Sequence, residues 1–200
     1  LNQATKILDF YKNLQIPVDL PAGVKVLDPF SAPSVWEIIE RFYLKYYNDL
    51  VPRTFLIGIN PGRLGAGITG IPFTDPVRLR DVLHISNNLG NKAELSSKFI
   101  YEIINEIGSA DVFFGSFYIT SVSPLGFVKD GKNLNYYDNK DLEIALESNI
   151  IESMWEQING IASNREVAFC LGQGKNYHYF DKLNKACGFF ERIVPLPHPR

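Results

Sequence analysis

Four short apolar runs, rich in β-branched and aromatic residues, alternate with amphipathic segments along this chain. The runs predict β-strands at 54–60, 112–119, 166–171 and 189–195. The spacing of apolar residues predicts helices at 3–14, 33–48, 76–88, 95–107, 140–162 and 175–186. Strands that alternate with helices indicate a parallel sheet covered on both faces. We therefore expect a three-layer αβα fold of the α/β class, with a central, four-stranded, mainly parallel sheet.

Each predicted strand is followed by a residue suited to a site. Asn60, Ser121, Gly172 and His198 lie just past the four strands, in chain order. Parallel sheets bind their ligands beyond the carboxyl ends of the strands. We expect these residues to converge there.

Composition limits the class of protein. The chain has 200 residues, of which 46% are apolar and 21% charged, with no repeat or linker, so we expect one soluble domain over residues 1–200. An apolar run of about 18 residues is absent, which argues against a membrane partner. The N-terminus has no initiator Met and no signal-peptide pattern, and we expect a trimmed chain. We also expect a monomer in the cytoplasm, or in the nucleoid of a bacterium.

The cysteines and histidines give little indication of a metal. Two cysteines suit a reduced, intracellular protein. Cys170 falls in a predicted strand and is expected in the core, and His84 and His178 are expected at ordinary surface or half-buried positions. Two cysteines and three scattered histidines make no convincing zinc or iron–sulfur site, so we expect no metal and no cofactor. His198 differs, because flanking prolines fix its backbone and can aim its side chain.

The charge balance lowers the expectation of a nucleic-acid partner without removing it. The net charge is −2 and the pI is near 5.9, whereas nucleic-acid-binding domains are usually basic. The basic residues nevertheless gather in the loops: Arg63, Arg78 and Arg80 follow a glycine-rich turn, and Lys129, Lys132 and Lys175 fall in other loops.

Two glycine-rich stretches resemble nucleotide-binding loops. Residues 65–70 match G-x-G-x-x-G, but the first glycine is several residues past the strand and Ile71-Pro72-Phe73 follows in place of a helix. "LGQGKNYH" lacks the first glycine and the Ser or Thr of a phosphate loop. It either places Gly174 and Lys175 near a phosphate at a helix N-terminus or is a plain strand-to-helix turn.

Residues 57–73, "IGINPGRLGAGITGIPF", resemble the first motif of the uracil-DNA glycosylase superfamily. They are most similar to the single-strand-selective monofunctional branch, whose pattern is G-M-N-P-G-x-x-G-x-x-x-T-G-V-P-F. The matches in register are Gly58, Asn60, Pro61, Gly62, Gly65, Thr69, Gly70, Pro72 and Phe73. The second motif of that branch, H-P-S-P-R, here reads His198-Pro199-Arg200, whereas the mismatch-specific branch has Asn at the first position. "SVSPLGF" at 121–127 resembles the family's N-x-C-P-L segment.

The resemblance implies a monofunctional DNA glycosylase that starts base excision repair, without AP-lyase activity. It would hydrolyse the N-glycosidic bond of uracil, and of other deaminated bases such as xanthine, in single- and double-stranded DNA. The catalytic residues would be Asn60 and His198. The substrate-binding residues would be Gly58, Ile59, Gly62, Phe73 and Ser121, and the DNA-binding residues Arg63, Gly174, Lys175 and Arg200.

The chemistry of this reaction suits these residue types. Its transition state carries positive charge on the sugar and negative charge on the departing base. Water needs only orientation against such an electrophile, which a neutral amide such as that of Asn60 supplies. Backbone N–H groups of the turn and the imidazole of His198 can stabilise the base anion. Phe73 would stack on the flipped base.

Departures from the family pattern affect the substrate and the affinity for DNA. Ser121 replaces the Asn that reads uracil, and Gly62 stands where the strictly uracil-specific branch has a Tyr. We therefore expect a wider, less selective pocket. The second motif is also shortened, and we expect the parent chain to continue past Arg200 into a basic loop that contacts DNA.

Two other functions stay open at the level of sequence. A binding module on the same fold would capture nucleotides or damaged strands without cleavage, but would not need both Asn60 and His198. An unrelated nucleotide-dependent α/β enzyme is supported only by the glycine fingerprint.

Overall fold

The structure is a computed structural model that describes residues 1–15, 17, 19–161 and 163–198. Its helices are α1 (Gln3–Lys12), α2 (Pro33–Tyr46), α3 (Ala66–Thr69), α4 (Pro76–Asp81), α5 (Leu95–Ile107), α6 (Ala110–Ser116), α7 (Lys140–Gly160) and α8 (Lys175–Cys187). Its strands are β1 (Lys25–Leu27), β2 (Arg53–Gly58), β3 (Phe117–Ser121), β4 (Gly126–Lys129), β5 (Lys132–Leu134), β6 (Ser163–Leu171) and β7 (Arg192–Leu196).

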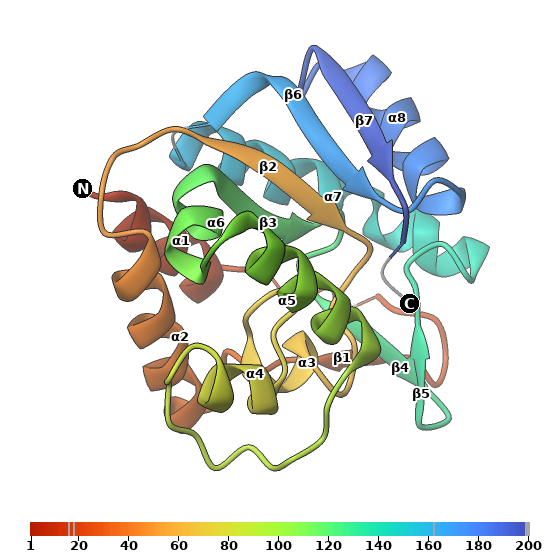
Figure 1. The fold of residues 1–200 in the computed structure, drawn as a ribbon. Coiled ribbons are helices and arrows are strands. Elements are labelled where there is room, and N and C mark those ends of the chain that lie inside the picture. Colours follow the sequence, from red (N-terminus) through yellow and green to blue (C-terminus); the bar gives the residue numbers. More distant parts are fainter. Residues whose placement is uncertain (16, 18, 162, 199–200) are drawn as a thin grey trace.

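The main sheet has four strands in the order β3-β2-β6-β7, and every pair is parallel. Helices α5 and α6 lie on one face and α7 on the other, so the sheet is the middle of three layers (Figure 1). The arrowheads of the strands point to the same edge (Figure 1). The predicted α/β fold with a four-stranded parallel sheet is thus confirmed.

Strand β2 is the centre of this sheet and is buried on both faces. Phe55 and Ile57 are fully buried and Leu56 is 6% exposed. A central parallel strand covered by helices needs a continuous apolar run rather than alternation. The run "TFLIG" meets that need.

A second, antiparallel sheet, β1-β4-β5, lies beside the carboxyl edge of the main sheet (Figure 1). Strands β4 and β5 form a hairpin across Asp130-Gly131, which have φ values of 51° and 72°. Two left-handed residues make the turn that suits the twist of a two-residue hairpin, and Asp-Gly is a preferred pair for it. Apolar runs in the sequence do not indicate this sheet, because its strands are only three or four residues long.

Two predicted elements differ from the structure. The predicted strand at 112–119 is helix α6 followed by β3, because Ser109 caps the helix by accepting a hydrogen bond from the Val112 N–H at 3.3 Å. The helix predicted at 76–88 ends at Asp81. Beyond it, exposed His84 has a left-handed φ of 57°, which is incompatible with a continuing helix.

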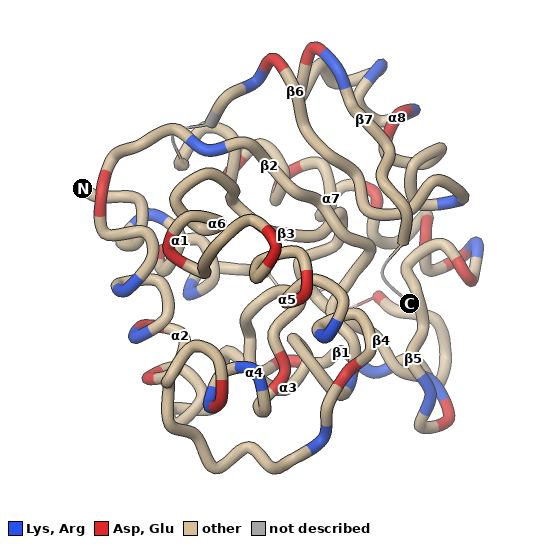
Figure 2. Tube along the Cα trace, in the orientation of Figure 1, with Lys and Arg blue, Asp and Glu red and all other residues tan. Residues whose placement is uncertain are grey.

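Charged residues of both signs are spread over the molecule (Figure 2). At the β4–β5 hairpin, Lys129 and Lys132 pair across the two strands, and Asp130 lies between them in the turn. Like charges directly opposite each other destabilise a hairpin. Among the described residues, the helices all lack the combination of length and apolar character that a membrane span requires.

Arg53 begins β2 with its side chain fully buried. Its guanidinium donates to the carbonyl oxygens of Phe114 at 2.6 Å and Tyr46 at 3.1 Å. It also donates to both carboxylate oxygens of Asp49, at 2.7 and 2.8 Å, and lies 4.7 Å from the centre of the Tyr47 ring. The hydrogen bond from Arg53 holds the pKa of Asp49 below its ordinary value. Arg53 thus ties the start of the central strand to α2 and α6.

We expect Arg53→Met to lower the free energy of unfolding by about 3 kcal/mol or more, since it leaves buried carbonyl groups and a carboxylate without their donor. Urea denaturation measures this change. The matched control is Arg41→Met, because Arg41 is 55% exposed and lies 3.8 Å from Glu37. An exposed pair of this kind contributes less than about 1 kcal/mol. Equal effects of the two substitutions would contradict the assignment.

Candidate active site

The polar residues predicted to converge do so at the carboxyl edge of the main sheet. Gly58 at the end of β2 is in register with Ser121 at the end of β3. The Val122 N–H donates to the Gly58 oxygen at 2.9 Å, and the Ser123 N–H to the Ile59 oxygen at 3.1 Å, so the pairing continues past the strands. A cavity of about 140 Å³ opens there. Its lining consists of Ile59, Asn60, Pro61, Gly62, Ala66, Pro72, Phe73, Glu94, Ser96, Ser121, Asn133, Asn135 and His198.

The amide of Asn60 is held at both ends, by the last residue of β5 and by the segment that follows it. Its Oδ1 accepts a hydrogen bond from the Tyr136 N–H at 3.1 Å, and its Nδ2 donates to the Leu134 oxygen at 3.3 Å. These partners also assign which end of the amide is oxygen. The plane of the Asn60 amide is therefore fixed before any substrate arrives.

Asn176, near the start of α8, holds Tyr136 in place through a buried hydrogen-bond network. Its buried side chain accepts from the Tyr136 hydroxyl at 2.8 Å and donates to the oxygens of Leu171 at 3.2 Å and Gly58 at 3.4 Å. Asn176 therefore joins the ends of β2 and β6 to the residue that holds Asn60. Buried networks of this kind are rigid when all of their members are satisfied.

Phe73 forms one wall of the cavity in a strained conformation. Its φ of 53° is unusual for a bulky residue. The turn is fixed by buried Thr69, whose hydroxyl donates to the Thr74 oxygen at 2.6 Å. The ring of Phe73 lies so close to the end of β2 that a methyl group on Gly58 would overlap it. This explains why a glycine ends the central strand.

Ser121 and His198 complete the cavity from the two sides of β2. Ser121 is 4% exposed, and its Oγ would lie 3.4 Å from a Cβ added to Gly58. His198 follows β7 and is half-buried. The Gly172 N–H donates to the Leu196 oxygen at 2.9 Å, and a Cβ added to Gly172 would lie 3.6 Å from Cδ2 of His198. Gly172 has a left-handed φ of 112°, a conformation that glycine adopts readily, and this brings the backbone after β6 close to His198.

Glu94 also lines the cavity, a residue that the sequence motifs did not indicate. Methyl groups on Gly62 or Gly65 would overlap its two carboxyl oxygens, so the space left by these glycines holds the carboxyl group. Burial raises the pKa of Glu94 above its ordinary value, a hydrogen bond with Ser96 acts in the opposite direction, and the negative charge of Asp75 raises it further. The expected free space beside Gly62 is thus occupied.

A neighbouring cavity of about 380 Å³ shares Ile59, Asn135 and His198 with the first. Gly174 and Lys175 line it, at the start of α8. They therefore lie beside the first cavity. Arg63 is exposed on the turn, where its N–H donates to Asn133 Oδ1 at 2.9 Å. Arg200 lies outside the described residues.

Cys170, His84 and His178 lie at the buried and exposed positions that the sequence predicts. Cys170 is fully buried, and burial raises its pKa to about 12. His84 and His178 are exposed and line neither cavity.

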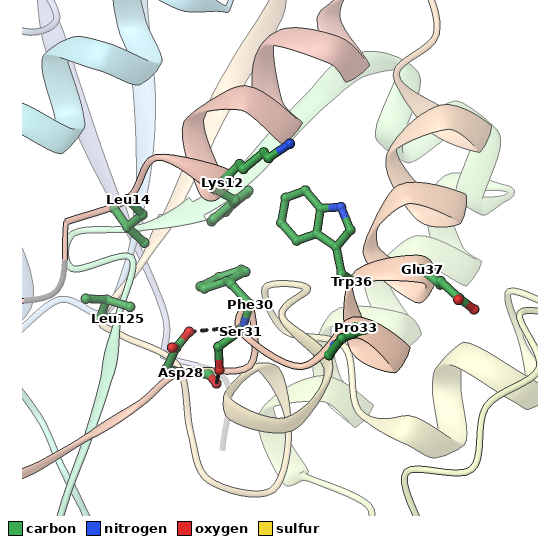
Figure 3. A pocket seen from close by; sticks show the side chains of 10 residues that line it. Lys12, Leu14, Asp28, Phe30, Ser31, Pro33, Trp36, Glu37 and Leu125 are labelled. Atoms are coloured by element: carbon green, nitrogen blue, oxygen red, sulfur yellow. Dashed lines mark hydrogen bonds between the residues drawn. The ribbon is translucent and has the colours of Figure 1, made fainter.

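A larger cavity of about 560 Å³ lies between α1, α2 and the segment before α2 (Figure 3). Trp36 and Phe30 face it, and charged Lys12, Asp28 and Glu37 are among its lining residues, although the carboxyl group of Glu37 points away from it (Figure 3). The rings of Tyr11 and Phe30, which stack with their centroids 4.8 Å apart, also line it. None of the predicted site residues lines it. The smaller cavity at the sheet edge is therefore the candidate active site.

Sequence comparison assigns the chain that carries this site to a known family. The sequence model described as "Uracil DNA glycosylase superfamily" matches residues 44–200. The chain belongs to the uracil-DNA glycosylase superfamily. Among solved structures, the crystal structure of wild-type SMUG2 from Pedobacter heparinus matches with a TM-score of 0.95 and 43% identity, over 100% of this chain and 88% of that one. Among curated proteins, none matches the chain significantly.

The comparison confirms the predicted resemblance to the single-strand-selective branch and supports a DNA glycosylase that acts on DNA. For this uracil-DNA glycosylase fold, the sequence motifs named the residues at the strand ends. They missed residues that line the cavity or hold Asn60 in place, namely Glu94, Asn133, Asn135, Tyr136 and Asn176. Asp130-Gly131 signals the hairpin that carries Asn133, but no local pattern indicates Glu94 or Tyr136.

We expect Asn176→Ala to lower the free energy of unfolding by about 1–3 kcal/mol, because it leaves the Tyr136 hydroxyl and buried carbonyl groups without partners. Chemical denaturation measures the loss. Tyr136→Phe removes the hydroxyl alone and is expected to cost less. Gln173→Ala, at an exposed neighbouring position, serves as the control and is expected to have an effect within about 0.5 kcal/mol. If Asn176→Ala behaved like this control, the network would not stabilise the sheet edge.

Proposed function

We propose that this chain is a monofunctional DNA glycosylase that hydrolyses the N-glycosidic bond of uracil, and of a bulkier deaminated base such as xanthine, in DNA. The observation that carries the proposal is the convergence of Asn60, Phe73, Ser121 and His198 around one cavity, from segments far apart in the chain. The family membership supports the class of reaction.

Asn60 is proposed to orient the attacking water. Its Oδ1 accepts one hydrogen bond from the Tyr136 N–H, which leaves its second lone pair for a hydrogen of the water. Because the amide is already fixed, orientation of the water requires no reorganisation during the reaction. An amide removes no proton, and none needs to be removed early when the sugar carries positive charge.

The departing base is proposed to leave as an anion, stabilised by His198 and by backbone N–H groups of the turn after β2. Donors aimed at a developing negative charge in a partly buried site are worth several kcal/mol. Phe73 supplies an aromatic face for the flipped base. Ser121 offers a rotatable hydroxyl that donates or accepts.

Exposed cations lie on elements that border the two neighbouring cavities. Arg63 is on the turn, Lys175 begins α8, and Lys132 faces Lys129 across the hairpin. The unfavourable pairing of two lysines suits a surface that contacts phosphates. We therefore propose that DNA binds across the hairpin and the start of α8, with an affinity that falls as salt rises.

The proposed activity is tested with single- and double-stranded oligonucleotides that contain one uracil or one xanthine. We expect strand cleavage at the damaged base only after alkali, because hydrolysis leaves an intact abasic site. Cleavage without alkali would indicate a lyase. Binding without any base release would support a binding module and would overturn the proposal.

We expect Asn60→Ala to lower the single-turnover rate of uracil release on the order of 10²–10⁴-fold, the typical effect of losing one positioned catalytic group. The circular dichroism spectrum should be unchanged. Asn159→Ala, at an exposed position on α7, is the matched control and should retain the full rate. A near-normal rate for Asn60→Ala would remove this residue from the mechanism.

We expect Ser121→Asn to raise the ratio of uracil to xanthine release. An amide offers a donor and an acceptor in a fixed plane that match the edge of uracil, and a site built on such pairs rejects other bases. The side chain at 121 is buried, so the larger residue also reduces the space for a second ring. Single-turnover rates on the two bases measure the ratio. Ser148→Asn, at an exposed position of α7, is the control. An unchanged ratio would show that Ser121 does not read the base.

A further inference from the structure

Glu94 is placed in the cavity by a rigid support. Its backbone N–H donates to Asp75 Oδ2 at 2.9 Å. Asp75 is fully buried, caps α4 by accepting from the Arg78 N–H at 2.9 Å, and forms an ion pair with the Arg78 side chain at 3.1 Å. Glu94 occupies the cap position of α5, but its side chain makes no capping hydrogen bond. Its carboxyl group is directed instead toward the glycine turn.

The carboxyl group of Glu94 lines the same cavity as Asn60, Phe73 and Ser121, directly against Gly62 and Gly65. A base held in this cavity therefore meets the carboxyl group. A purine presents a ring-nitrogen acceptor, N7, in its five-membered ring. Uracil has a single ring and lacks this acceptor.

On the basis of the proposed function, we propose that Glu94 determines specificity: its protonated carboxyl donates a hydrogen bond to the five-membered ring of a purine base and thereby favours release of xanthine. The proton stays on the carboxyl, and no bond other than the glycosidic bond is broken. An ionised carboxylate at this position would repel the departing anion and has nothing to donate.

The surroundings of Glu94 favour its protonated form. Burial and the negative charge of Asp75 raise the pKa of its carboxyl. The other titratable or charged groups on the elements around it are Arg63 in the turn, Arg78, Arg80 and Asp81 on α4, Lys92 before α5, Lys98, Tyr101, Glu102 and Glu106 on α5, and His198 beyond β7. Arg78 is paired with Asp75.

The test compares wild type, Glu94→Gln and Glu94→Ala on single-stranded oligonucleotides with one uracil or one xanthine, from acidic to neutral pH. In wild type we expect the ratio of xanthine to uracil release to fall as pH rises and Glu94 loses its proton. Glu94→Gln keeps a donor of similar size and should remove this pH dependence. Glu94→Ala should lower xanthine release about tenfold or more relative to uracil, the effect of one lost hydrogen bond. The control is Glu102→Gln, at a 63% exposed side chain on α5.

Stability provides a readout that does not depend on activity. A carboxyl whose pKa is raised by folding binds its proton more tightly in the folded state, so the free energy of unfolding falls as pH rises through the raised pKa. Glu94→Gln lacks this group. We therefore expect the variant to gain stability relative to wild type with rising pH.

The outcomes separate the two proposals. If wild type releases neither base, the proposed function fails. If it releases both, and the xanthine-to-uracil ratio is the same in wild type, Glu94→Gln and Glu94→Ala at every pH, Glu94 does not determine specificity. Release of uracil alone would overturn the inference in the same way, and so would identical pH profiles of stability for wild type and Glu94→Gln.

Discussion

The parallel pairing of β2 with β3 on one side and β6 on the other is the constraint on which the rest of the structure depends. It brings Gly58 level with Ser121 and sets the end of β6 beside the same edge. Asn60, Ser121 and His198 then each lie at a strand end or two residues past one. Arg53 anchors the other end of β2, so the strand is fixed at both of its termini. A site built in this way takes its geometry from the sheet rather than from loops.

The arrangement of the sheet was predictable because its signal is long and local. The runs around Phe55 and Cys170 are apolar throughout, as buried parallel strands require. Helix α6 was not predictable in this way, since the aromatic and β-branched residues of 112–119 satisfy a strand equally well and the cap at Ser109 decides between them. The hairpin is indicated by the dipeptide Asp130-Gly131, which favours a two-residue turn. Long apolar runs carry no information about it, because its strands are short.

The residues of the site also differ in whether the sequence identifies them. Asn60, Phe73 and His198 belong to motifs or stand at strand ends, so the sequence identifies them. Tyr136 and Glu94 act through a backbone N–H and a carboxyl group that reach the cavity from other elements. Their roles arise from tertiary contacts, which no sequence spacing encodes. The glycines of the turn illustrate the difference: the sequence indicates that space is needed, whereas only the structure shows that Glu94 fills it.

The position of β7 makes the part of the site that follows it less stable than the part that follows β2. Among the described strands β7 pairs only with β6, and its Pro195 has no N–H to donate to the ladder. Such an edge opens at a lower free-energy cost than the core. His198 follows β7, whereas Asn60 follows the buried central strand. Local opening of β7 would therefore remove His198 from the cavity while Asn60 and most of the fold stay in place.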